Sequence, residues 1–106
     1  MAGIEETSIL DLVTYDESNG VVALIMIATQ PWTEERVLAL QSKTQRYLDF
    51  VESGELSRAY PEAQGMRVRL QLDASFALTE LAKQFVVTAE REWCRPLGIQ
   101  FVVEEN

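Results

Sequence analysis

The sequence contains no histidine and a single cysteine, Cys94, among its 106 residues. Histidine is the side chain that most often binds transition metals and acts as a general base near neutral pH, so its absence argues against both kinds of chemistry. A lone cysteine cannot form a disulfide within the chain. The acidic residues do not recur at the spacing of a calcium-binding loop. We therefore expect neither a metal nor a cofactor.

Cys94 is not expected to be a nucleophile. It falls near the end of the second predicted helix, where the negative end of the helix dipole disfavours a thiolate. Activation would require a neighbouring base, and no histidine can supply one. The sequence also lacks a phosphate-binding P-loop, a dinucleotide-binding glycine fingerprint and a nucleophile elbow. We predict no catalytic residue, and a buried or incidental thiol at this position.

Basic residues are scarce: nine lysines and arginines stand against 17 aspartates and glutamates, for a formal net charge of −8. Nucleic acids and anionic membranes are bound mainly through clustered cations, which this chain lacks, so we expect neither partner. The longest unbroken apolar run, Val21–Ala28, is far too short to cross a bilayer. The acidic start of the chain has no leader pattern, and we expect a cytoplasmic protein.

Glycine and proline are few, five and three, and they separate the predicted elements. A chain of this length can bury one core, so we predict a single domain over residues 1–106. The expected elements are strands over 9–15, 21–29, 66–73 and 97–105, helices over 33–54 and within 75–95, and a short helical turn over 56–60. Right-handed crossovers would place both helices on one face. This order predicts an α+β fold, a two-layer α/β sandwich in β-β-α-β-α-β order with a mixed four-stranded sheet.

The predicted helices have distinct buried stripes. In the first, Thr33 suits the N-cap, and the buried positions are Val37, Leu40, Thr44, Tyr47, Leu48 and Val51. We interpret the charges on its other side as an ordinary solvated face: Lys43, Arg46, Asp49 and Glu52. The second helix is expected to bury Leu78, Leu81, Ala82, Phe85, Ala89 and Trp93.

The strand over 21–29 is apolar on both faces, which a two-layer fold does not require. One face carries Val21, Ala23, Ile25 and Ile27, and the other Val22, Leu24, Met26 and Ala28. If helices cover one side, the apolar patch on the other side marks an interaction surface. Three possibilities remain for what covers this apolar patch: a second copy of the protein, another part of the same chain, or a bound molecule. For the first, we predict an interface of Leu10, Leu12, Val22, Leu24 and Met26.

Polar side chains follow the second and third predicted strands. If these strands are parallel neighbours, one edge of the sheet gathers Thr29, Gln30, Trp32, Asp73 and Ser75. Open α/β sheets tend to bind ligands at this edge, where Asp73 would act as a base or ligand anchor. The alternative is structural: Asp73 or Ser75 caps the second helix, and Trp32 packs against its neighbours.

A combination of short motifs resembles a family of small bacterial proteins classed only as a domain of unknown function. The positions that carry the resemblance are Pro31-Trp32, Lys43, Tyr47, Phe50, Gly54-Glu55-Leu56 and Tyr60-Pro61. The resemblance extends over nearly the whole chain and implies a shared α/β fold and a bacterial origin. It implies no activity, catalytic residue or cofactor.

The sequence thus predicts a small acidic interaction module that forms a homodimer or binds another protein, rather than an enzyme. The alternative is a small-molecule-binding protein or enzyme with its site at the strand ends near Trp32 and Asp73. An interaction module predicts a closed strand-end region, whereas a binding protein predicts a pocket there that Trp32 lines and Asp73 enters.

Overall fold

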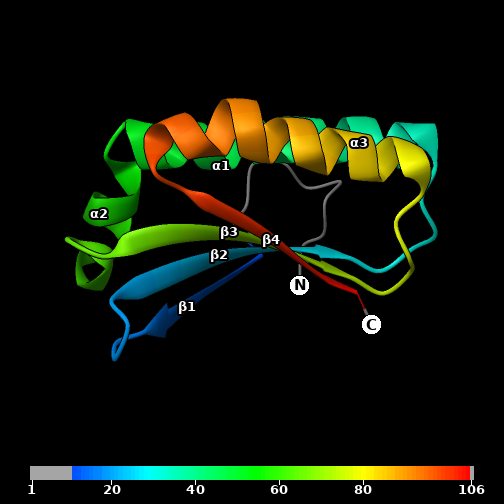
Figure 1. The fold of residues 1–106 in the computed structure, drawn as a ribbon. Coiled ribbons are helices and arrows are strands. Elements are labelled where there is room, and N and C mark those ends of the chain that lie inside the picture. The colour runs from blue at the N-terminus through cyan, green and yellow to red at the C-terminus, as the bar shows by residue number, and fades with distance from the viewer. Residues whose placement is uncertain (1–10, 106) are drawn as a thin grey trace.

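A computed structural model describes residues 11–105 of the chain. Its elements are β1 (Leu12–Asp16), β2 (Val21–Ala28), α1 (Glu34–Glu52), α2 (Glu55–Ala59), the 3-10 turn η1 (Pro61–Ala63), β3 (Arg67–Ala74), α3 (Glu80–Thr88), the π-helical segment η2 (Ala89–Cys94), the 3-10 turn η3 (Arg95–Leu97) and β4 (Gln100–Glu105). The two long helices, α1 and α3, lie side by side over one face of the sheet (Figure 1). This arrangement confirms the predicted mixed α/β sheet fold and its order of elements.

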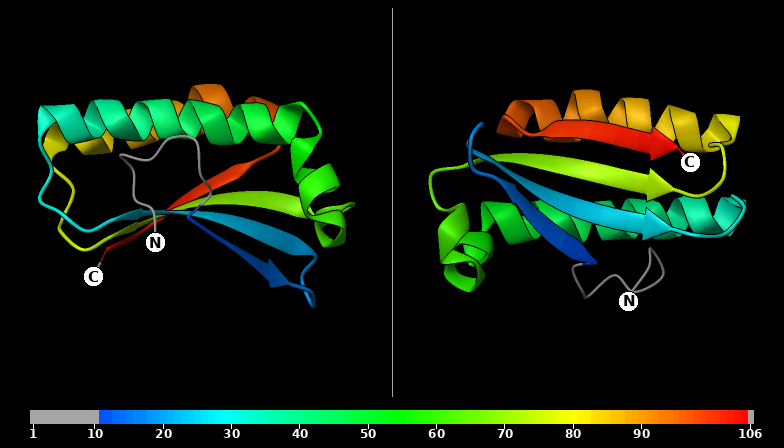
Figure 2. Two further views of the ribbon diagram at one scale, coloured as in Figure 1. Left: turned by 180° about the vertical axis from the view of Figure 1, so that it is seen from behind. Right: turned by 90° about the horizontal axis from the view of Figure 1, so that it is seen from below.

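The sheet has the strand order β1-β2-β3-β4. Strand β1 runs antiparallel to β2, and both later pairings, β2 with β3 and β3 with β4, are parallel. The turn between β1 and β2 closes with a bond from Asn19 N to Asp16 O, and Gly20 takes the left-handed backbone angle that the turn needs (φ +65°). In the right-hand view of Figure 2, the side of this sheet away from α1 and α3 faces the viewer.

Helix α1 begins and ends as the sequence predicts. The Thr33 hydroxyl accepts a hydrogen bond from Arg36 N at 3.3 Å and caps the helix. After the last turn, Gly54 adopts a left-handed conformation (φ +85°) and its N–H donates to Val51 O, which is the usual role of glycine at this position. The α1–α2 junction then turns Leu56 into the core, where it is 4% exposed.

Helix α3 differs from the prediction at its start and on one face. Its N-cap is Thr79, whose hydroxyl accepts from Ala82 N, so the expected cap at Asp73 or Ser75 is wrong. The reason is that the chain leaves β3 through a bend at Ser75 and Phe76 and reaches Thr79 before the helix begins. Leu81 was expected in the buried stripe, but it is 47% exposed because the stripe passes through its neighbour Ala82.

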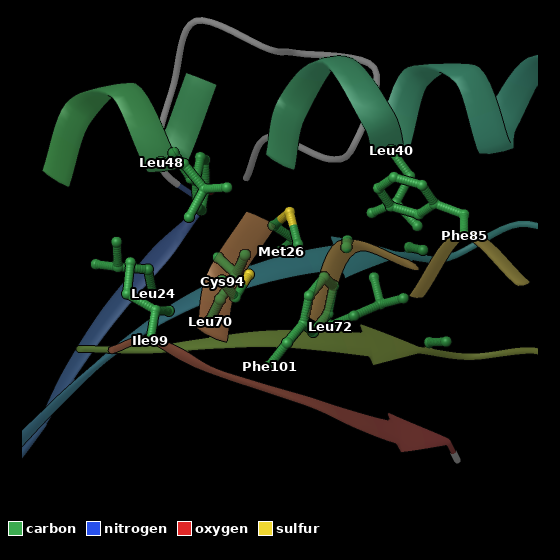
Figure 3. Close-up of a cluster of buried hydrophobic side chains, with 14 of the residues drawn as sticks. Leu24, Met26, Leu40, Leu48, Leu70, Leu72, Phe85, Cys94, Ile99 and Phe101 are labelled. Atoms are coloured by element: carbon green, nitrogen blue, oxygen red, sulfur yellow. The ribbon is translucent and has the colours of Figure 1, made fainter. Parts of the chain in front are cut away.

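The core lies between the helices and one face of the sheet. Figure 3 shows leucine and methionine side chains of β2 and β3 meeting Leu40 and Leu48 from α1 and Phe85 from α3. On β2 the core-facing residues are Val22, Leu24, Met26 and Ala28, all of them buried. None of the helices within residues 11–105 is long and apolar enough to cross a membrane.

Candidate functional site

The predicted strand-end residues do lie near one edge of the sheet. Strands β2 and β3 are parallel neighbours, and Ser75 N donates to Ala28 O just beyond their ends. Thr29, Gln30 and Ser75 are exposed. The indole of Trp32 is only 8% exposed, and its Nε1 donates to the carbonyl of Phe76 at 3.3 Å. Trp32 therefore ties the connection before α1 to the connection before α3.

Asp73 lies on the side of the sheet away from the helices. Its carboxylate Oδ1 accepts a hydrogen bond from Gln71 Nε2 at 2.8 Å, two residues earlier on the same strand. Its register partner on β2 is Ile27, and its partner on β4 is Glu104. Asp73 and Trp32 thus make separate contacts, with Gln71 and with Phe76: Trp32 is packed in the hydrophobic core, and Asp73 caps no helix.

The residues of the predicted interface divide between two sides of the sheet. Leu10 lies outside the described residues. Val22, Leu24 and Met26 are inaccessible beneath the helices, so the chain itself covers this face of β2. Leu12 pairs with Ile25, not with Leu24, and is 43% exposed on the opposite side. A contact through the sheet would therefore have to use Leu12 and the other face of β2.

We call this side, away from α1 and α3, the open face. Its residues, taken at alternate positions along the four strands, are Leu12, Thr14, Asp16, Val21, Ala23, Ile25, Ile27, Arg67, Arg69, Gln71, Asp73, Gln100, Val102 and Glu104. The half of the open face that β1 and β2 contribute is largely apolar, whereas β3 and β4 contribute mostly polar and charged side chains. The Nε atom of Arg69 is buried there without a hydrogen-bond partner within residues 11–105.

The sequence interpretation missed a buried ion pair. Lys43 was expected to be solvated, but its side chain is 0% exposed and its Nζ lies 2.5 Å from Asp11 Oδ1. The second carboxylate oxygen of Asp11 accepts from Ile27 N at 2.8 Å, and Asp11 N donates to the hydroxyl of Tyr47 at 2.8 Å. The cation also lies 5.8 Å from the Tyr47 ring centroid. These contacts fasten α1 to the start of β1 and the end of β2.

Tyr47 is part of the same cluster, and its environment suits a structural role. Burial raises the pKa of its hydroxyl, and the negative charge of Asp11 adds to this effect. The phenol is therefore neutral at physiological pH and is held as a hydrogen-bond partner rather than as a base. Since Lys43, Asp11 and Tyr47 satisfy one another in the interior, the cluster positions elements of the fold and offers no accessible reactive group.

Cys94 is fully buried at the end of η2. Burial raises the pKa of its thiol to about 11, and the charge of Glu90 contributes in the same direction. We therefore expect the folded protein to resist an aromatic disulfide reagent near about pH 8, where the thiol stays protonated. The measurement is the labelling rate with and without denaturant; rapid labelling of the folded protein would contradict the buried placement.

Within residues 11–105, acidic and cysteine side chains form no cluster of three that is arranged to hold a metal ion. A family model matches residues 2–106 of the chain, and its description is "Family of unknown function (DUF6572)". This match confirms the resemblance to an uncharacterised family. No curated protein and no solved structure matches the chain.

Proposed function

We propose, from the premise that the chain belongs to this family of unknown function (DUF6572), that the protein is a cytoplasmic interaction module that forms a homodimer through its open face. The observation that supports this proposal is the two-sided apolar strand β2. The helices cover its even-numbered residues. On the open face Ala23 and Ile25 are 2% and 6% exposed, whereas Val21 and Ile27 are partly exposed and Leu12 of β1 is 43% exposed, and no helix of residues 11–105 lies over this side of the sheet. A second copy would cover this side.

The polar residues of the open face are arranged in a self-complementary way. At one end, β3 and β4 carry hydrogen-bond donors, Arg69 and Gln100, and at the other end they carry carboxylates, Asp73 and Glu104. A twofold axis along the row through Gln71 would bring each donor to the matching carboxylate of the partner copy, since both pairs are symmetric about that row. The contact would pair the charges of Arg69 and Asp73, and it would give the carboxylate of Glu104 a hydrogen-bond donor from the amide of Gln100.

Asp16 lies at the donor end but is already engaged. Its carboxylate accepts hydrogen bonds from Asn19 Nδ2 at 2.7 Å and from the Ser18 hydroxyl at 2.9 Å. These bonds lower the pKa of Asp16, so it remains ionised within its own turn. The carboxylate of Asp16 therefore stabilises the β1–β2 turn, and the polar contacts with the partner copy would come from residues of β3 and β4.

The size of the face indicates a dimer of modest affinity. Four strands spaced at about 4.8 Å, with about 3.3 Å per residue along the longest, span roughly 500 Å² for each copy. The pair would bury about 1,000 Å², at the lower limit for a specific interface. We therefore expect association that depends on concentration, rather than an obligate dimer.

The test compares two exposed leucines, Leu12 on the open face and Leu38 on the outer side of α1, which are 43% and 55% exposed. Leu12→Glu should give a folded monomer, because two carboxylates would meet in the apolar part of the contact. Leu38→Glu makes the same chemical change on the helical layer and should leave association as in the wild type. Sedimentation equilibrium over a range of concentrations measures both. A wild type that is monomeric throughout, or equal effects of the two substitutions, would refute the proposal.

A further inference from the structure

A groove on the helical layer lies between α1 and the segment that follows α3. It has a volume of about 550 Å³ and is lined on one side by α1 and on the other by η2 and η3. The lining residues are Gln45, Leu48, Asp49, Glu52, Glu92, Trp93, Pro96 and Leu97. A volume of this order is within the range of sites that bind small molecules or inserted side chains of a partner. Because it lies on the helical layer, the groove is separate from the open face.

The apolar part of this groove comes from a distorted stretch of helix. The segment η2 has π-helical backbone, which is rare and is often found where a helix serves a function. Trp93, on this segment, packs edge-on against Phe85 with ring centroids 5.4 Å apart, and it remains only partly buried. Leu97 is 40% exposed beside it. The ring of Trp93 therefore gives the groove an aromatic surface, and its contact with Phe85 fixes the position of that ring.

The titratable side chains that line the groove all carry charge of one sign. All three titratable residues that line the groove are acidic: Asp49, Glu52 and Glu92. Glu92 makes a solvent-exposed pair with Arg91 at 3.4 Å, whereas Asp49 and Glu52 make no ion pair within residues 11–105. The whole chain adds a net charge of −8, so cations are attracted from a distance as well as at the site.

We propose that this groove binds a basic segment of a partner protein, in which an apolar side chain enters beside Trp93 and neighbouring lysines or arginines reach the carboxylates of α1. Tryptophan is prominent among the residues that dominate binding at protein interfaces, and cations bind favourably over its ring. The carboxylates contribute mainly to selectivity and to the rate of encounter. The proposal does not depend on dimer formation, because the two surfaces share no residue.

The first experiment uses a synthetic capped peptide in which lysine alternates with leucine, together with a matched peptide in which glutamate replaces every lysine. Binding is followed through the two indole N–H signals in the NMR spectrum. The Trp93 signal should shift with the lysine peptide, whereas the Trp32 signal should stay in place, because that indole is bonded to Phe76 O. The glutamate peptide should shift neither. The Leu12→Glu variant should bind as the wild type does.

The second experiment separates the groove from the net charge of the protein. One variant neutralises the three groove carboxylates as Asp49→Asn, Glu52→Gln and Glu92→Gln, and its control neutralises three exposed glutamates elsewhere, Glu17, Glu35 and Glu62. The groove variant should bind the lysine peptide about tenfold more weakly, as expected for the loss of three exposed charge pairs. The control should change binding by less than about twofold. Equal losses in both variants, an unshifted Trp93 signal or equal binding of the glutamate peptide would each overturn the proposal.

Discussion

Replacing Lys43 with methionine is expected to lower the free energy of unfolding by about 3–5 kcal/mol, because it leaves the buried carboxylate of Asp11 without its cation. Both side chains are 0% exposed, so water cannot take the place of the missing ammonium group. Methionine has nearly the length of lysine and fills most of the same space. The loss would therefore come mainly from the unpaired charge. Chemical denaturation at neutral pH measures it.

Two further variants make this expectation specific. The double variant Lys43→Met with Asp11→Asn should recover much of the lost stability, since neither side chain is then charged in the interior. The exposed pair Arg91–Glu92, with both side chains more than half accessible, provides the control: Arg91→Met should have little measurable effect. If Lys43→Met lowered the free energy of unfolding as little as Arg91→Met, the buried placement of the ion pair would be wrong. If the double variant were no more stable than the single one, the loss would be one of packing.

The order of elements could be predicted because local signals agreed with one another. Strand β3 alternates cleanly, with Val68, Leu70 and Leu72 on one side and charged or polar residues on the other, so its faces follow from the sequence alone. The cap at Thr33 and the stop at Gly54 are local backbone requirements that depend on the residue type. The right-handed crossover rule then places both helices on one face.

The interface could not be assigned in the same way, because both faces of β2 are apolar. Which face meets the helices depends on the register with β3, where Leu24 lies beside Leu70 and Ile25 beside Gln71. A slip of one residue would exchange the two faces, and no property of β2 alone excludes that slip. The prediction grouped Leu12 with Leu24, whereas the observed antiparallel register pairs Leu12 with Ile25.

The buried pair of Lys43 and Asp11 was missed for a different reason. Its two members are 32 residues apart, and charge alone favours a solvated position. A signal was nevertheless present, since Lys43 lies three residues after Leu40 and four before Tyr47, and both of these belong to the buried stripe. A lysine placed between two buried positions of one helix face indicates an interior partner of opposite charge.

Leu24→Glu is expected to unfold the protein, whereas Leu12→Glu should leave it folded. The two residues belong to paired strands, yet Leu24 is 0% exposed and contributes to the core, and Leu12 is 43% exposed on the open face. Removing a buried leucine costs about 3–5 kcal/mol, and burying a carboxylate in its place adds several more, which together approach the whole stability of a domain of this size. Circular dichroism and the dispersion of NMR signals would measure the difference. A folded Leu24→Glu protein would mean that this side of β2 is accessible. The candidate dimer interface would then lie on the side of Leu24 rather than on that of Leu12.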